Sequence, residues 1–165
     1  MLKHSDVCTH ISNPEDVDIL TRKLFDVNLR LYETSEQYRD IVTDCCDYIH
    51  WAATTTREGY KTPHGFSAAN GGIPFNIIAI ADGDVIINPK IAGFSGERLS
   101  MSNCGSLTLD KPIKIRRYAQ VTVQGWTQDI DGTLVPYSKT GYLPTHQHEI
   151  DHNNGVLITD RAVRT

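Results

Sequence analysis

The sequence has no excess of positive charge and no cluster of basic residues. Its 165 residues include 16 lysines and arginines against 20 aspartates and glutamates, a formal net charge of −4. The basic residues are scattered along the chain, so the sequence lacks the basic stripe with which proteins bind nucleic acid. We therefore expect no direct nucleic-acid partner.

Long apolar runs and a dense set of cysteines are also missing. No run approaches the roughly 20 residues of a membrane-spanning helix, and the N-terminus, Met1-Leu2-Lys3-His4, lacks the apolar core of a signal peptide. Four cysteines in a chain of this size do not make a disulfide scaffold. Adjacent Cys45 and Cys46 are interpreted as inert core thiols. These absences predict a soluble, cytoplasmic protein that does not associate with membranes.

What is present is enough for one folded domain. A hydrophobic content of 39% over 165 residues can bury a core, and we expect a single domain, 1–165, with 1–17 as a loosely attached extension. The segment Thr34-Ser35-Glu36-Gln37 resembles a helix cap, and apolar residues follow it at spacings of three, four and seven as far as Trp51. This pattern predicts a long helix that ends near Ala53.

Strands and a second helix are expected after it. Phe75–Ala81 and Val85–Asn88 are short apolar runs around a turn at 82–84, and 114–126 partly alternates. After Pro144 a short helix is expected, with Thr145 as its N-cap and Gly155 as its stop. The predicted fold class is α+β, with antiparallel or mixed sheets around this central short helix and one long N-terminal helix.

The short helix carries the clearest chemical pattern. His148-Glu149-Ile150-Asp151-His152 is an H-E-x-x-H sequence, and residues four apart share one face of a helix, so both imidazoles can bind one metal ion. A divalent cation lowers the pKa of bound water, and Glu149 is placed to take its proton. The alternative is a polar surface helix with two chance histidines.

A catalytic metal site of this type needs a third protein ligand and leaves a position open for water. Cys104 is the natural candidate, because it lies in the small, polar segment Ser102-Asn103-Cys104-Gly105-Ser106. Taken alone, the segment favours a buried structural thiol over a metal ligand.

Three separated segments resemble the signature motifs of the peptide deformylases, in the same order. Residues 147–152, followed by Gly155, match the third motif fully. Residues 102–106 keep only the Cys and the final Ser of the second motif, and Gly65-Phe66-Ser67-Ala68-Ala69-Asn70-Gly71-Gly72 resembles the first without gaps. The resemblance extends from about Asp18 to Asp160.

The resemblance implies a function and a set of catalytic residues. Cys104, His148 and His152 would hold one divalent metal, Fe²⁺ in the cell with Zn²⁺ or Ni²⁺ as alternatives. Glu149 would be the general base and then the proton donor in removing the N-formyl group from the methionine of nascent polypeptides. Asn70, where the family has Gln, and the Gly105 N–H would bind the oxyanion.

The resemblance also implies where substrate binds. Gly65, His64, Thr145 and His146 are the candidate substrate-binding residues, and N-formylmethionyl peptides are expected to pair with an exposed strand edge near Gly65 or Gly105. The methionine pocket would be lined by residues smaller or more polar than the family's aliphatic residues: His64, Gly105, Gly141, Pro144 and Thr145.

Two other functions are open. A zinc peptidase shares the H-E-x-x-H helix, but its third ligand normally follows the helix, where only Asp160 is available. A degenerate relative could keep the metal and bind nascent chain ends without turnover. The short C-terminal segment resembles the short family members, including those of bacteriophages. We also expect a monomer, and a location in the cytoplasm, that of the host if the protein is phage-encoded.

Overall fold

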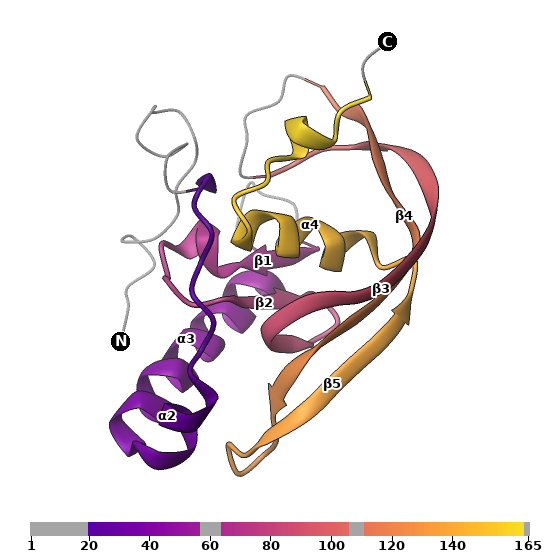
Figure 1. The fold of residues 1–165 in the computed structure, drawn as a ribbon. Helices are drawn as coiled ribbons and strands as arrows, with labels where there is room; N and C mark the ends of the chain where they lie inside the picture. Colours follow the sequence, from indigo (N-terminus) through magenta and orange to yellow (C-terminus); the bar gives the residue numbers. More distant parts are fainter. Residues whose placement is uncertain (1–19, 57–63, 106–110, 164–165) are drawn as a thin grey trace.

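A computed structural model describes residues 20–56, 64–105 and 111–163. The described chain forms one five-stranded antiparallel sheet in the order β1-β2-β3-β4-β5, with helices on its concave side (Figure 1). The strands are β1 (Gly65–Ser67), β2 (Ile77–Ile80), β3 (Val85–Ser102), β4 (Ile113–Gln128) and β5 (Leu134–Gly141). The helices are α2 (Leu29–Thr34), α3 (Glu36–Thr54) and α4 (Pro144–Asn153), with 3₁₀ turns η2 (Ala68–Gly71) and η3 (Ile158–Arg161). The predicted α+β class is confirmed, and the expected extension 1–17 lies outside the described residues.

The long helix α3 forms where the sequence predicts it. The Ser35 side chain accepts a hydrogen bond from the Tyr38 N–H, as an N-cap does. The buried face of α3 packs against β2 and includes Cys45 and Cys46. Burial raises the pKa of both thiols, that of Cys45 to about 11. Neither therefore forms a thiolate near neutral pH, in agreement with their interpretation as inert core residues.

Strand β3 is longer than its sequence pattern indicates. β3 runs to Ser102, well beyond the predicted end at Asn88. Only residues 85–87 of β3 pair with β2, whereas its outer half pairs with β4 alone and is largely exposed. A strand with one neighbour and little burial does not need alternating apolar residues, so the sequence carries no strong signal for it.

Helix α4 lies between the short strands β1 and β2 and the curved β3–β4 hairpin (Figure 1). Ile150 anchors it among Ile78, Ile86 and Val123 of the sheet. The predicted Thr145 cap is wrong: the helix begins at Pro144, which suits the first helical position, and Leu143 precedes it with a φ of 37° and no side-chain cap. The predicted glycine after the helix is confirmed. Gly155 has a φ of 74°, and a Cβ there would clash with the Thr21 carbonyl oxygen.

None of the helices in the described part of the chain is long and apolar enough to cross a membrane.

Candidate metal centre and active site

Three potential metal ligands converge between the end of β3 and α4. Cys104 follows β3, and His148 and His152 lie one turn apart on α4. Cys104 Sγ is 3.4 Å from His152 Nε2, which is 3.1 Å from His148 Nε2, and the three donor atoms all lie within 4.8 Å of one another. Bonds of about 2.0 Å to nitrogen and about 2.3 Å to sulfur place tetrahedral zinc ligands roughly 3.3 to 3.6 Å apart. The donor set therefore fits one cation of this size.

The protein keeps both histidines neutral, the charge state that metal binding requires. Burial lowers the pKa of His148 to about 3, with the His152 and Arg117 charges adding to the shift, and it lowers the pKa of His152 to about 4. Arg117 lies 3.1 Å from His148 Nδ1, and a guanidinium can only donate, so Nδ1 accepts. The neutral ring then carries its proton on Nε2, facing His152. A neutral imidazole that binds a cation through Nε2 carries its proton on Nδ1 instead, so metal binding requires the other tautomer of His148 and a changed contact with Arg117.

Glu149 lies beside these ligands on the same helix. Its side chain is buried, and its Oε2 has no hydrogen-bond partner among the described residues. Burial raises the pKa of Glu149 to about 8, against the opposing charge of Arg117. A carboxyl group titrating near neutral pH suits both taking and returning a proton, although a bound cation would favour the carboxylate and lower this pKa.

The sheet holds α4 through side chains that the motif does not predict in this role. The Gln147 amide donates to the Tyr118 and Tyr142 carbonyls and accepts from the Tyr118 N–H. Asn153, which is buried, accepts from the Ala69 N–H and donates to the Ile77 carbonyl. The catalytic helix is thus tied to β4 on one side and to β2 and η2 on the other.

The two expected oxyanion donors lie in different local structures. Asn70 is in η2, where its N–H is directed to Ser67 Oγ at 3.4 Å and its neighbour Ala69 is fixed by Asn153. Gly105 is exposed in a turn directly after Cys104. β3 ends at Ser102, so Gly105 itself lies in no strand of the described residues.

The four candidate substrate-binding residues divide into two groups. Gly65 begins β1, the edge strand of the sheet, with exposed His64 just before it and half-buried Thr145 packed against it. The expected strand edge near Gly65 is therefore present. His146 is buried instead, 3.2 Å from the Tyr137 hydroxyl. It lies two residues from His148, about 200° around the helix, so its side chain points away from the metal ligands.

Comparison of nearly the whole sequence with known protein families establishes the family of this chain. Residues 19–165 match the family model described as polypeptide deformylase. The chain belongs to this family.

Its relatives cover different shares of the chain. The peptide deformylase of Dictyoglomus thermophilum is 38% identical over 104 residues, which span 60% of this chain and 65% of the relative. Peptide deformylase 2 of Geobacillus stearothermophilus is 30% identical over 143 residues, 77% of this chain and 76% of the relative. The chain thus spans slightly less than two thirds of the first relative's length.

Solved structures share the fold. The class I type b peptide deformylase from Acinetobacter baumannii, in a crystal structure described as Met-Ala-Ser bound, superposes with a TM-score of 0.67 at 23% identity. The match covers 94% of this chain and 96% of the other.

No role was predicted from the sequence for Arg117, which contacts His148 Nδ1, or for Asn153, which ties α4 to β2 and η2. Each acts through a contact with a distant segment, and neither belongs to a recognisable local pattern. The one sequence feature that could have indicated a role is the position of Arg117 within a partly alternating strand, on the side expected to be buried.

Proposed function

We propose that this chain hydrolyses the formyl group from the N-terminal methionine of N-formylmethionyl peptides and releases formate. One observation carries the proposal: a thiol and two imidazoles converge on one point beside the buried Glu149 carboxyl, in a chain that belongs to the polypeptide deformylase family. Its Acinetobacter relative, described with Met-Ala-Ser bound, supports a peptide N-terminus as the ligand.

We assign Cys104, His148 and His152 as the ligands of one divalent ion. The family is metal-dependent, and the thiol and imidazoles suit Fe²⁺, Zn²⁺ or Ni²⁺. We propose Fe²⁺ as the ion in the cell. When bound, the ion would supply a water of lowered pKa and polarise the formyl carbonyl.

The remaining steps belong to the chain's own residues. Glu149 takes a proton from the attacking water and returns it to the leaving amine as the C–N bond breaks, giving formate and a free N-terminus. The Asn70 amide and the Gly105 N–H stabilise the negative charge on the former carbonyl oxygen. The edge of β1 at Gly65, which pairs with no second strand among the described residues, pairs with the peptide backbone and orients it.

Formate release from formyl-Met-Ala-Ser by the purified, metal-loaded protein tests this proposal. We expect one metal ion per chain and equal amounts of formate and free Met-Ala-Ser. Cys104→Ala should lose the metal and the activity. Cys45→Ala is the matched control, because Cys45 is also buried but lies on α3, and it should keep both.

The outcomes separate the candidate functions. Tight metal binding and peptide binding without formate release would contradict the deformylase and favour the non-catalytic relative. Cleavage of internal peptide bonds would favour the zinc peptidase. Full metal content in Cys104→Ala would remove Cys104 from the ligand set.

A further inference from the structure

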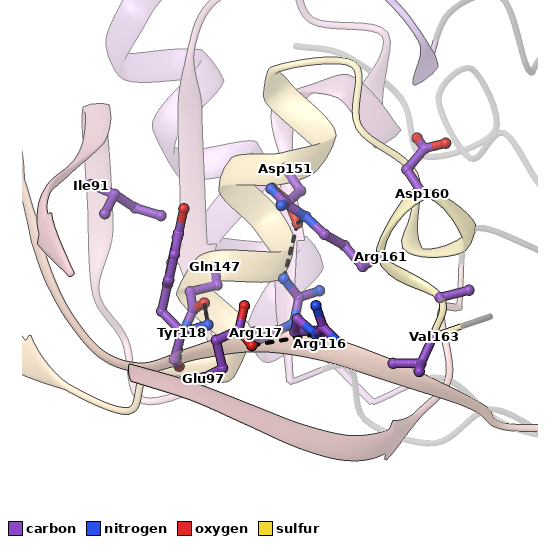
Figure 2. Close-up of a pocket in the computed structure, with 11 residues that line it drawn as sticks. Ile91, Glu97, Arg116, Arg117, Tyr118, Gln147, Asp151, Asp160, Arg161 and Val163 are labelled. Atoms are coloured by element: carbon purple, nitrogen blue, oxygen red, sulfur yellow. Dashed lines mark hydrogen bonds and ion pairs between the residues drawn. The ribbon is translucent and has the colours of Figure 1, made fainter. Parts of the chain in front are cut away.

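Two arginines from different elements bind the carboxylate of one residue on the metal-binding helix. Asp151 lies between the two ligand histidines in sequence, and Arg117 of β4 donates to its Oδ2 at 2.9 Å. Arg161, at the end of η3, binds both oxygens, through Nε at 3.1 Å and NH2 at 2.8 Å. Figure 2 shows both arginines directed toward Asp151, Arg117 from below and Arg161 from the right. The proposed mechanism uses none of these three residues.

Because the Asp151 carboxylate is buried, it needs paired charges and hydrogen bonds to be stable in the folded protein. The Asp151 side chain is 9% exposed and that of Arg117 is 3% exposed. A buried carboxylate is costly unless it is paired and its oxygens accept hydrogen bonds. Arg117 occupies only Oδ2 and also contacts His148 Nδ1. Arg161 is therefore the residue that completes the hydrogen bonding of Asp151 on Oδ1.

The segment that carries Arg161 is itself fixed in place. Ile158 of η3 is buried, and Asp160 accepts from the Leu157 N–H. Beyond the arginine, the Val163 N–H donates to the Lys114 carbonyl and Ala162 forms a bridge with Ile115. The backbone that carries Arg161 is thus held in place by contacts that do not involve Asp151, which favours a directed contact over a chance surface ion pair.

A cavity of about 370 Å³ adjoins the contact and is lined by Arg116, Arg117, Asp151 and Arg161, among others. The Arg161 side chain is 39% exposed. Its truncation therefore removes the hydrogen bonds to Asp151 without opening a hole in the core. Arg116 provides a matched control, because it lines the same cavity but pairs with exposed Glu97 at 3.6 Å.

We propose that Arg161 is a positioning residue for the metal centre: with Arg117 it holds Asp151, and through Asp151 it fixes the helix that presents His148 and His152. This inference rests on the proposed metal site. Residues that orient metal ligands typically contribute about 10- to 100-fold in metal affinity.

Zn²⁺ binding to the metal-free protein, measured by competition with a chelator, tests the inference. We expect Arg161→Ala to bind Zn²⁺ about tenfold more weakly than the parent. Arg161→Lys keeps the charge but loses the two-point contact, so its affinity should lie between those of the parent and Arg161→Ala. Arg116→Ala should match the parent. Thermal unfolding of each metal-free variant reports any general loss of stability separately.

Parent-like zinc affinity in both Arg161 variants would overturn the inference, as would an equal loss in Arg116→Ala. So would lower thermal stability of Arg161→Ala with unchanged zinc affinity, because Arg161 would then be structural only. If Arg161→Ala does not fold, Arg161→Lys decides by the same criterion. Cys104→Ala separates the two proposals: if it binds Zn²⁺ as tightly as the parent, the proposed metal site itself is wrong.

Discussion

Glu149 and Asn70 are expected to act on the same reaction in different ways. Glu149 moves protons, and its carboxyl is buried where no described side chain competes for Oε2. Asn70 would act only when negative charge has developed on the carbonyl oxygen. Substitutions at the two positions should therefore have different kinetic effects.

Glu149→Gln should keep the metal and the fold but lose nearly all turnover. The amide fills the same space but cannot accept the proton of the attacking water, and loss of a general base costs about 10² to 10⁴ in rate. Metal content and kcat for formyl-Met-Ala-Ser check this expectation. A variant within tenfold of the parent would show that another group moves the proton.

Asn70→Gln should lower kcat with little change in KM. The η2 turn has little freedom to absorb an extra methylene, because Asn153 holds Ala69 and the Ile73 N–H donates to the Ala68 carbonyl. A longer side chain would then direct its amide away from the oxyanion. Asn70→Ala removes the donor and should lose about 10² to 10³ in kcat.

The opposite results for Asn70 are equally informative. A rise in kcat in Asn70→Gln would mean that the shorter amide reaches the oxyanion poorly. Parent-like rates in both variants would show that Asn70 is not an oxyanion donor. In either case KM separates effects on the transition state from effects on substrate binding.

Among the elements, β1 and α4 pack closely against each other at Gly65. A Cβ at Gly65 would lie 2.7 Å from Thr145 Cγ2 and 3.0 Å from Glu149 Cγ. Both atoms belong to the catalytic helix. The strand proposed to bind substrate thus packs directly against the general base.

Gly65→Ala should therefore reduce activity by pushing Glu149 from its place. A shift of about 1 Å can cost on the order of 10²-fold in rate, and overpacking costs about 1 to 3 kcal/mol of stability. Gly93→Ala is the control, because a Cβ there meets nothing within 4 Å. Activity and thermal unfolding of both variants test this, and parent-like activity in Gly65→Ala would show that α4 can move aside without loss.

Elements with a regular pattern could be predicted from the sequence, and those formed by distant contacts could not. The apolar spacing after Ser35 predicts α3, and the H-E-x-x-H spacing predicts the shared face of His148 and His152. Helix α2 was missed because it is only six residues long and has one buried residue, Tyr32. The outer half of β3 and the position of Arg161 depend on contacts with residues distant in sequence, and no local spacing of apolar residues predicts such contacts.

In the whole molecule, the candidate metal centre connects segments that are far apart in sequence. Cys104 follows the end of β3, whereas His148 and His152 belong to α4, more than 40 residues later. The β3–β4 hairpin curves around this helix (Figure 1). Metal binding should therefore stabilise the folded chain as a unit, because the unfolded chain does not hold the three ligands together.

Adding Zn²⁺ to the metal-free protein should raise its Tm. At a free concentration of 100 times Kd, binding stabilises the folded state by about 2.7 kcal/mol, and each kcal/mol shifts the Tm of a domain of this size by about 2 to 4 °C. We therefore expect an increase of roughly 5 to 11 °C, measured by calorimetry. Cys45→Ala should show the same increase and Cys104→Ala much less. An equal increase in Cys104→Ala would place the stabilising zinc ion elsewhere, and no increase in the parent would mean that the three donors do not bind zinc together.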